Sequence, residues 1–121
     1  MRSKWIEHKE KKIFYQDFSG LFYNSQAVKE ELLAVQSVVI REPKDSVLVI
    51  SNFTDTTIGS DLMPLLNASS KMTKDHVHKT AVLGVTGIKR TLGDLLSRLT
   101  SQPLMYFASI EEAKDWLTND Y

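Results

Sequence analysis

Polar side chains that could take part in chemistry follow three apolar segments of this sequence. Those segments read as strands, and in an α/β sheet the ligand site lies beyond the carboxyl ends of the strands. Together these side chains offer two carboxylates, several hydroxyls and two cations. The residues concerned are Asp17, Ser19, Asn52, Thr54, Asp55, Thr56, Thr57, Thr86, Lys89 and Arg90.

Catalysis by this group would rest on its two carboxylates. Asp17 and Asp55 could in principle act as a general acid and base, as in a hydrolase. No histidine follows these strands, however, and no serine has a base at a recognisable spacing. Aspartate, serine, threonine and asparagine are also the usual residues of turns and helix caps. We therefore predict no catalytic residue and keep the hydrolase as an alternative.

Metal and cofactor motifs are equally weak. His76 and His78 form a His-x-His pair beside Asp75, but lysines surround them and no third ligand is evident. We interpret this stretch as a solvated loop and predict no metal. Glycines at 84 and 87 precede Lys89, yet they match neither the dinucleotide nor the phosphate-loop pattern, so we predict no cofactor.

The run Asp55-Thr56-Thr57 is a candidate site for a modification. We expect its hydroxyls to be exposed at the amino end of a helix that begins at Ser60 or Asp61. A phosphate there would gain from the helix dipole and would change the local charge sharply. The alternative interpretation is an ordinary threonine-rich turn.

Alternating strands and helices must position these residues. The hydrophobic pattern predicts strands at residues 4–8, 12–18, 46–50, 80–85 and 104–107. It predicts helices from Asn24 or Ser25 to about residue 41, from residue 60, over residues 88–99, and after Ser109, where Glu112 completes a capping box. The continuous run VLVI at 47–50 indicates a strand that is covered on both faces. Such an order predicts right-handed crossovers and a largely parallel sheet, with the first strand at an antiparallel edge.

Composition limits the classes of function. The 121 residues fit one domain, spanning residues 1–121. The formal net charge is zero, so no overall basic field attracts nucleic acid. Cysteine is absent, which suits a reducing compartment. No apolar stretch is long enough to span a bilayer and the first residues lack the apolar run of a signal peptide, so we expect a cytoplasmic protein.

The chain resembles the SpoIIAA-like branch of small bacterial proteins, which has the anti-sigma-factor antagonist (STAS) fold. The segments that carry the resemblance are HKEKKIFYQDFSG, SVLVISNFTD, AVLGVTGIKR and YFASIEEAKDWL. It implies an α/β fold on a STAS-like plan, with a mixed, mostly parallel sheet of about five strands and about four flanking helices. In antagonists of this family a strand ends in Asp-Ser-Ser-Gly, a serine there is phosphorylated by a partner kinase, and phosphorylation controls binding. The matching run here is 55–59, in which Thr57 is the closer match and Thr56 the other option.

We therefore expect a non-enzymatic regulatory binding module with a protein partner. Its contact surface would centre on residues 52–59 and the helix from 60 to 72. The expected switch residues are Thr57 and Thr56, and the expected binding residues are Asp17, Asn52, Asp55, Ser60, Thr86 and Lys89.

The main alternative is a carrier of a small lipid or apolar ligand. SpoIIAA-like proteins are sometimes grouped with the CRAL-TRIO lipid-binding proteins, and Phe18 with Leu21, Phe22 and Tyr23 could flank a small apolar cleft. The same residues suit a core or a dimer interface equally well, and neutral α/β domains often form homodimers.

Overall fold

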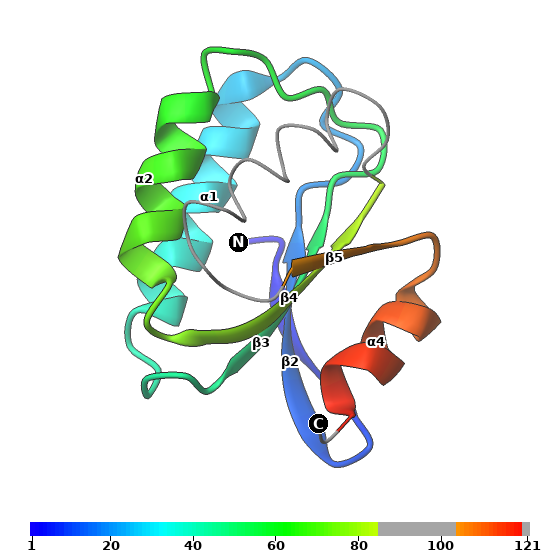
Figure 1. Ribbon diagram of the computed structural model, residues 1–121. Coiled ribbons are helices and arrows are strands. Elements are labelled where there is room, and N and C mark those ends of the chain that lie inside the picture. Colours follow the sequence, from blue (N-terminus) through cyan, green and yellow to red (C-terminus); the bar gives the residue numbers. More distant parts are fainter. Residues whose placement is uncertain (85–103, 120–121) are drawn as a thin grey trace.

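The computed structural model describes residues 1–84 and 104–119, which form a five-stranded sheet with helices on both faces (Figure 1). The predicted helix at 88–99, and with it the expected count of four helices, lies outside these residues. None of the helices in the two ranges combines the length and the apolar character needed to cross a bilayer. The elements are, in chain order, β1 (Lys4–His8), β2 (Lys11–Asp17), α1 (Ser25–Val39), β3 (Val47–Asn52), α2 (Met63–Thr73), β4 (Val77–Leu83), β5 (Leu104–Phe107) and α4 (Ile110–Thr118).

The sheet has the predicted mixed topology. Its strand order is β1-β2-β3-β4-β5, in which β1 is antiparallel to β2 and every other neighbouring pair is parallel. The sheet therefore begins with an antiparallel edge, as expected. β3 lies at its centre, and five of its six residues are buried, which confirms the prediction from the VLVI run.

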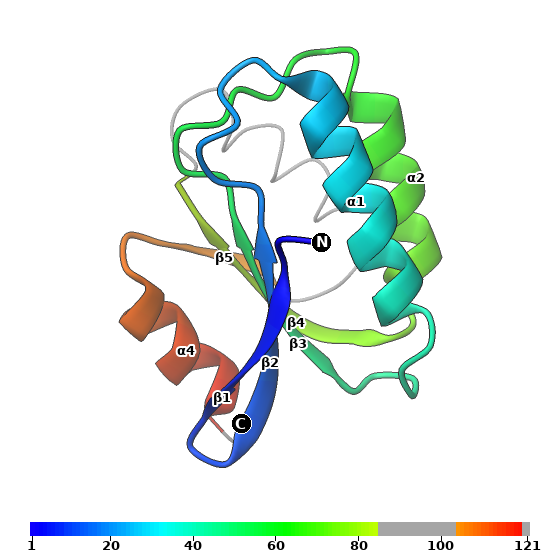
Figure 2. The same cartoon turned by 180° about the vertical axis from the view of Figure 1, so that it is seen from behind.

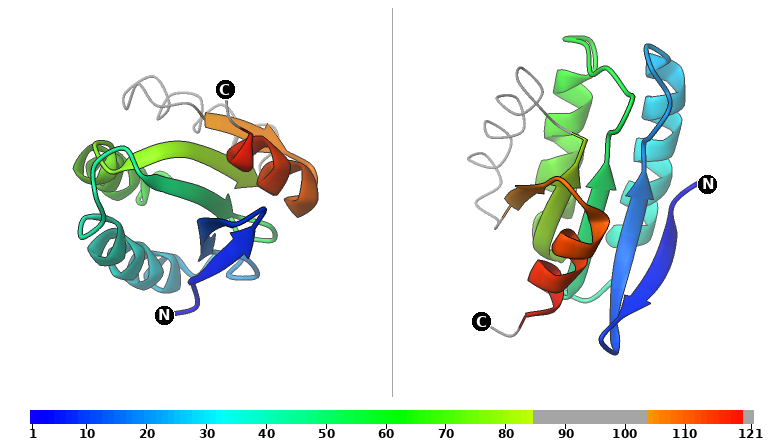
Figure 3. Two further views of the ribbon diagram at one scale, coloured as in Figure 1. Left: turned by 90° about the horizontal axis from the view of Figure 1, so that it is seen from below. Right: turned by 90° about the vertical axis from the view of Figure 1, so that its right-hand side faces the viewer.

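Alternate residues of β3 face two separate cores. Val47 and Val49 point into the core beneath α1 and α2, whereas Leu48 and Ile50 point into the core beneath α4. Two helices thus cover one face of the sheet and α4 covers the other (Figures 2 and 3). The buried side of α1 includes an apolar stripe at helical spacing, formed by Val28, Leu32, Val35 and Val39.

Two of the helices begin with side-chain caps that the sequence predicts. Asn24 accepts a hydrogen bond from the amide of Ala27 at 3.1 Å, and Ser109 accepts one from the amide of Glu112 at 3.2 Å. Each cap satisfies an amide that has no partner within its helix.

The third helix, α2, begins later than predicted. It starts at Met63, and its cap residue Leu62 makes no side-chain hydrogen bond, so neither Ser60 nor Asp61 is the cap. Pro64 then stands at the second helical position, within the first turn, where its missing N–H loses no hydrogen bond of the helix. Residues 59–62 instead form a turn, in which the amide of Leu62 bonds the carbonyl of Gly59 at 3.1 Å.

The prediction of a loop up to residue 79 was also wrong, because β4 begins at Val77. Val47 pairs with Val77 but Leu48 pairs with Lys79, so His78 is an extra residue that shifts the register. Lys79 is buried, with its ammonium against the end of α4. The extra residue interrupts the regular alternation of inward and outward side chains by which a strand is predicted from sequence. In addition, the inward position 79 is occupied by a lysine, which the hydrophobic pattern does not count as buried.

Candidate functional site

Two loops meet over the carboxyl ends of β2 and β3, at the edge where the sequence predicts a site. They are residues 18–24 and residues 53–62. The amide of Gly20 donates to the carbonyl of Thr54 at 2.8 Å, and the amide of Phe22 donates to that of Asp55 at 2.8 Å. The amide of Thr57 returns a bond to the carbonyl of Phe22 at 2.7 Å, so Phe22 and Thr56 form an isolated parallel bridge. The loops therefore continue the pairing of β2 with β3 and hold each other in place.

Thr56 is part of that framework and not an exposed hydroxyl, which corrects the prediction for this residue. Its side chain is 1% exposed. The hydroxyl donates a short hydrogen bond to the carbonyl of Phe18 and accepts one from the amide of Leu21 at 3.1 Å. A buried hydroxyl that satisfies two backbone groups cannot be modified while the loops stay closed.

Thr57 differs from its neighbour because it is exposed. Its amide is fixed to Phe22, so the position of its side chain is defined by the loop crossing. Since α2 starts only at Met63, Thr57 does not lie at a helix amino terminus, contrary to expectation. Ser60 is likewise exposed and precedes the helix by three residues.

The carboxylate of Asp17 is held by neighbouring residues through its Oδ1 atom. It accepts hydrogen bonds from the amide of Ser19 at 3.0 Å and from the hydroxyl of Ser19 at 2.6 Å, and Arg2 lies 3.5 Å away. Burial alone would raise the pKa of Asp17, but the two bonds from Ser19 and the charges of Arg2 and Lys4 lower it overall. Asp17 is therefore an anion that already accepts two hydrogen bonds from Ser19. A general acid needs a protonated carboxyl group instead.

Asn52 also acts on the protein itself. Its amide oxygen accepts from the backbone and the hydroxyl of Thr54 at 3.0 and 2.6 Å, and its amide nitrogen donates to the hydroxyl of Tyr15 at 2.7 Å. This side chain thereby shapes the first turn of the loop after β3.

A close approach between two strand ends fixes the same turn from below. Gly84, the residue after β4, has φ +75°, and a Cβ at this position would lie 2.4 Å from the amide nitrogen of Thr54. Both the positive φ and the close approach of Thr54 require glycine at this position. Thr86 and Lys89, two further predicted binding residues, lie outside the described part of the chain.

The prominent exposed feature of this edge is a pair of aromatic side chains. Phe22 is 61% exposed and Tyr23 is 83% exposed. Leu21, by contrast, packs against the core beneath α1 and α2, and Phe18 is buried. The four side chains proposed to flank one apolar cleft therefore divide between core and solvent, because Gly20 (φ +66°) and Phe22 (φ +49°) reverse the chain between them.

A second group that sequence reasoning missed lies beside the loops, at the amino terminus. Glu31 is a charged residue of α1, yet it is only 7% exposed. Its carboxylate accepts hydrogen bonds from the amide of Arg2 at 3.0 Å, and from the amide and hydroxyl of Ser3 at 2.8 and 2.5 Å. Ser3 in turn accepts from the amide of Asp17 at 2.9 Å. No local pattern marks Glu31, because its partners are about 28 residues away.

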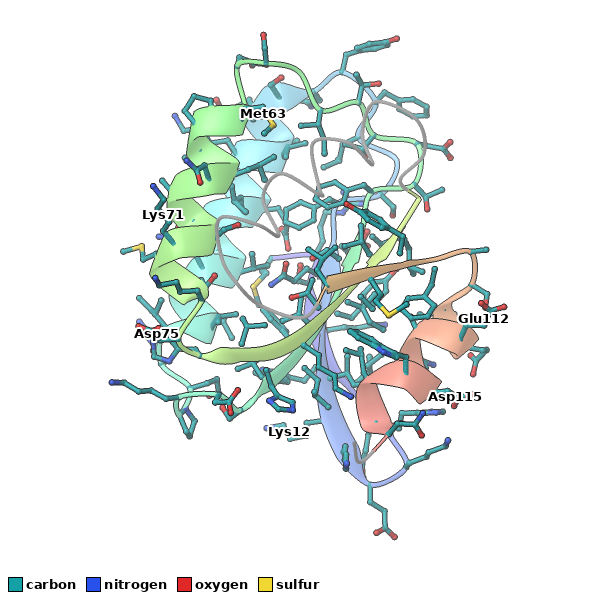
Figure 4. The ribbon with its side chains drawn as sticks, viewed as in Figure 1. Lys12, Met63, Lys71, Asp75, Glu112 and Asp115 are labelled. Atoms are coloured by element: carbon teal, nitrogen blue, oxygen red, sulfur yellow. The ribbon has the colours of Figure 1, made fainter. Side chains whose placement is uncertain are left out.

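An open groove of about 800 Å³ lies at the other end of the sheet. Figure 4 shows Lys12, one of its lining residues, at the opposite end of the molecule from Met63. Charges of both signs line it, including Glu42, Asp45 and Lys12. The two histidines of the His-x-His pair have separate partners, since Nδ1 of His76 lies 2.7 Å from the carbonyl of Glu42 and Nδ1 of His78 lies 2.9 Å from Asp45.

Within residues 1–84 and 104–119, no group of three or more histidine, aspartate or glutamate side chains is arranged to hold a metal ion. Comparison of the chain with protein-family models, with curated proteins and with solved structures found no match. The function has to be inferred from the loops and strand ends described above.

Proposed function

We propose that this protein is a cytoplasmic, non-enzymatic regulatory binding module of the STAS-like (SpoIIAA-like) kind. In this proposal the partner is a protein, the contact surface is formed by the crossed loops 18–24 and 53–62, and Thr57 is the switch. Asp55 and Ser60, both exposed on the second loop, belong to the same surface.

The observation that carries the proposal is the contrast between Thr56 and Thr57. One hydroxyl is buried in the framework, while the next is exposed on a backbone that the framework holds in position. A rigid scaffold that presents an accessible group on a loop is typical of recognition sites.

The polar groups at the ends of β2 and β3 favour binding over catalysis. Asp17 bonds to Ser19, and Asn52 bonds to Thr54 and Tyr15. A hydrolase that used Asp17 and Asp55 would need a carboxylate that is free to exchange a proton, and the lowered pKa of Asp17 argues against that role.

Phosphorylation of Thr57 would act on the partner and not on the fold. A phosphate carries about −1.5 to −2 charges near neutral pH. The two loops contain no lysine or arginine, so they offer no side-chain cation to neutralise it, and Asp55 lies two residues away. The added charge would thus face outward.

The test is to measure partner binding with a phosphate mimic. A partner is first isolated with tagged wild-type protein, and its affinity is then measured for Thr57→Glu and for Ser37→Glu. We expect Thr57→Glu to change the affinity at least about tenfold, which corresponds to about 1.4 kcal/mol. Ser37→Glu is the matched control, because it adds the same charge at an exposed hydroxyl on α1, outside the crossed loops.

Intact-mass measurement of protein from its own source, with peptide mapping, adds an independent reading. A phosphate on Thr57 supports the proposal. Equal partner affinities for wild type and Thr57→Glu, with no phosphate on Thr57, would refute the switch.

A further inference from the structure

We infer that the partner docks through a short cationic segment, rich in arginine or lysine, onto the aromatic pair Phe22 and Tyr23 beside Asp55. This inference rests on the proposed function, because it names the class of partner that the crossed loops bind.

The aromatic pair has the properties of a preorganised anchor. Both side chains are more exposed than buried, at 61% and 83%. Phe22 also holds a left-handed backbone conformation, φ +49°, which is unusual for a bulky residue. The two backbone bonds of Phe22 to Asp55 and Thr57 hold that conformation in place. The backbone beneath the two exposed rings is therefore held in one conformation, which lowers the backbone entropy lost on binding.

The charge of the two loops selects the sign of the partner. Of aspartate, glutamate, lysine and arginine, these loops contain only Asp55 and Asp61, and both are exposed. Aromatic faces attract guanidinium and ammonium groups, and nearby carboxylates add to this attraction. The carbonyl of Asp55 bonds the amide of Phe22 at 2.8 Å, so this residue and the aromatic pair lie on one surface.

The size of the pair favours a short segment over a second copy of the chain. Two aromatic side chains bury at most about 300–500 Å² together. A stable dimer interface needs roughly 800 Å² from each partner. The pair is thus large enough to anchor a few residues of a peptide but small for a subunit interface.

The experiment measures the binding of a fluorescein-labelled nonapeptide of alternating arginine and glycine by fluorescence anisotropy at low salt. A peptide with glutamate in place of arginine tests the sign of the charge. Vesicles of phosphatidylcholine, alone or with phosphatidylserine, test whether the aromatic pair binds a lipid surface instead. Tyr23→Ala removes the more exposed ring, and Asp55→Asn removes a charge while keeping a residue type that tolerates φ +57°.

We expect the arginine peptide alone to bind. Tyr23→Ala should weaken it at least about tenfold, as for a hot-spot aromatic residue, and Asp55→Asn about threefold, with a loss that shrinks as salt is added. Leu33→Ala is the control, because Leu33 is 45% exposed on α1 and should leave the affinity unchanged. Preferential binding of the glutamate peptide, an unaltered affinity in Tyr23→Ala, or binding to vesicles but not to the arginine peptide would overturn the inference.

The outcomes also separate this inference from the proposed function. If partner binding depends on Thr57 but the arginine peptide does not bind, the class of partner is wrong and the switch stands. If the peptide binds through Tyr23 and Thr57→Glu leaves the native partner's affinity unchanged, the switch is wrong and the docking surface stands.

Discussion

One carboxylate, that of Glu31, secures the amino-terminal segment to α1. Two backbone amides and one hydroxyl donate to it, and the same hydroxyl accepts from the amide of Asp17 at the start of the first loop. Burial alone would raise the pKa of Glu31, but these hydrogen bonds from Ser3 and Arg2 lower it below its ordinary value of 4.5. A buried anion whose pKa is lowered stabilises the fold only while it is charged.

Replacing this carboxylate by an amide should therefore destabilise the protein. Glu31→Gln keeps the shape and loses the charge, and we expect the free energy of unfolding at neutral pH to fall by about 1–3 kcal/mol. Urea denaturation measures the change. The control is Glu30→Gln on the exposed side of the same helix, where the expected change is within about 0.5 kcal/mol.

The pH dependence of this difference checks its cause. Since the folded pKa of Glu31 lies below 4.5, its contribution is fully present above pH 4.5 and is lost as the pH falls through the folded value. The unfolding free energies of wild type and Glu31→Gln should therefore converge as the pH falls below the folded pKa of Glu31. Asp17 follows the same direction in both proteins and leaves the comparison intact. A difference that persists unchanged in acid would mean that shape, and not charge, holds the segment.

The candidate site shows what the sequence can and cannot predict at the level of a residue. From the apolar runs, the sequence predicted the ends of β2 and β3, and so the position of residues 52–57 after a strand. It could not separate Thr56 from Thr57, since that difference depends on a crossing with a loop more than 30 residues away. The exposure of Tyr23 was not predicted either. The apolar run Leu21–Tyr23 is typical of a buried segment, and the sequence does not show that the chain turns within it.

Among the elements, prediction succeeded where one regular pattern ran without interruption. The buried run gave β3, and the stripe from Val28 to Val39 gave α1. It failed at the start of β4, where an extra residue shifts the register and Lys79 takes an inward position. The long stem of lysine can lie in an apolar environment if its ammonium finds acceptors, and composition alone does not reveal them.

Lys79 joins two elements that are far apart in the sequence. Its ammonium donates to the carbonyls of Trp116 and Asn119, both at 3.2 Å, and lies 5.1 Å from the centre of the Trp116 ring. These carbonyls belong to the end of α4, where backbone acceptors lack partners within the helix and a cation is favourable.

Lys79→Met should therefore loosen α4 while keeping the buried stem. We expect a loss of about 1–3 kcal/mol in unfolding free energy, with faster amide hydrogen exchange in α4 than elsewhere. Lys114→Met is the matched control, because its ion pair with Glu111 at 3.5 Å is exposed and contributes less than about 0.5 kcal/mol. Equal effects of the two substitutions would show that Lys79 contributes little beyond its stem.

At the scale of the whole molecule, the sheet is shared by two cores. The four apolar residues of β3 from Val47 to Ile50 alternate between them, so neither core can lose this strand without the other. Chains of fewer than about 150 residues usually unfold in one step. We accordingly expect the helices on the two faces to unfold together.

The two tryptophans of the chain allow this cooperativity to be measured, because one lies on each face. Trp5 packs on Phe14 in the core beneath α1 and α2, with ring centres 4.8 Å apart, and Trp116 packs on Phe107 beside α4 at 5.6 Å. In Trp5→Phe and Trp116→Phe, fluorescence then follows one face at a time during guanidinium denaturation. Within each variant, the midpoint from fluorescence should coincide with the midpoint from circular dichroism of the whole chain. If fluorescence of Trp116 in Trp5→Phe changed at a clearly lower guanidinium concentration than circular dichroism, α4 would separate from the sheet before the rest unfolds, and the shared strand would not couple the two cores.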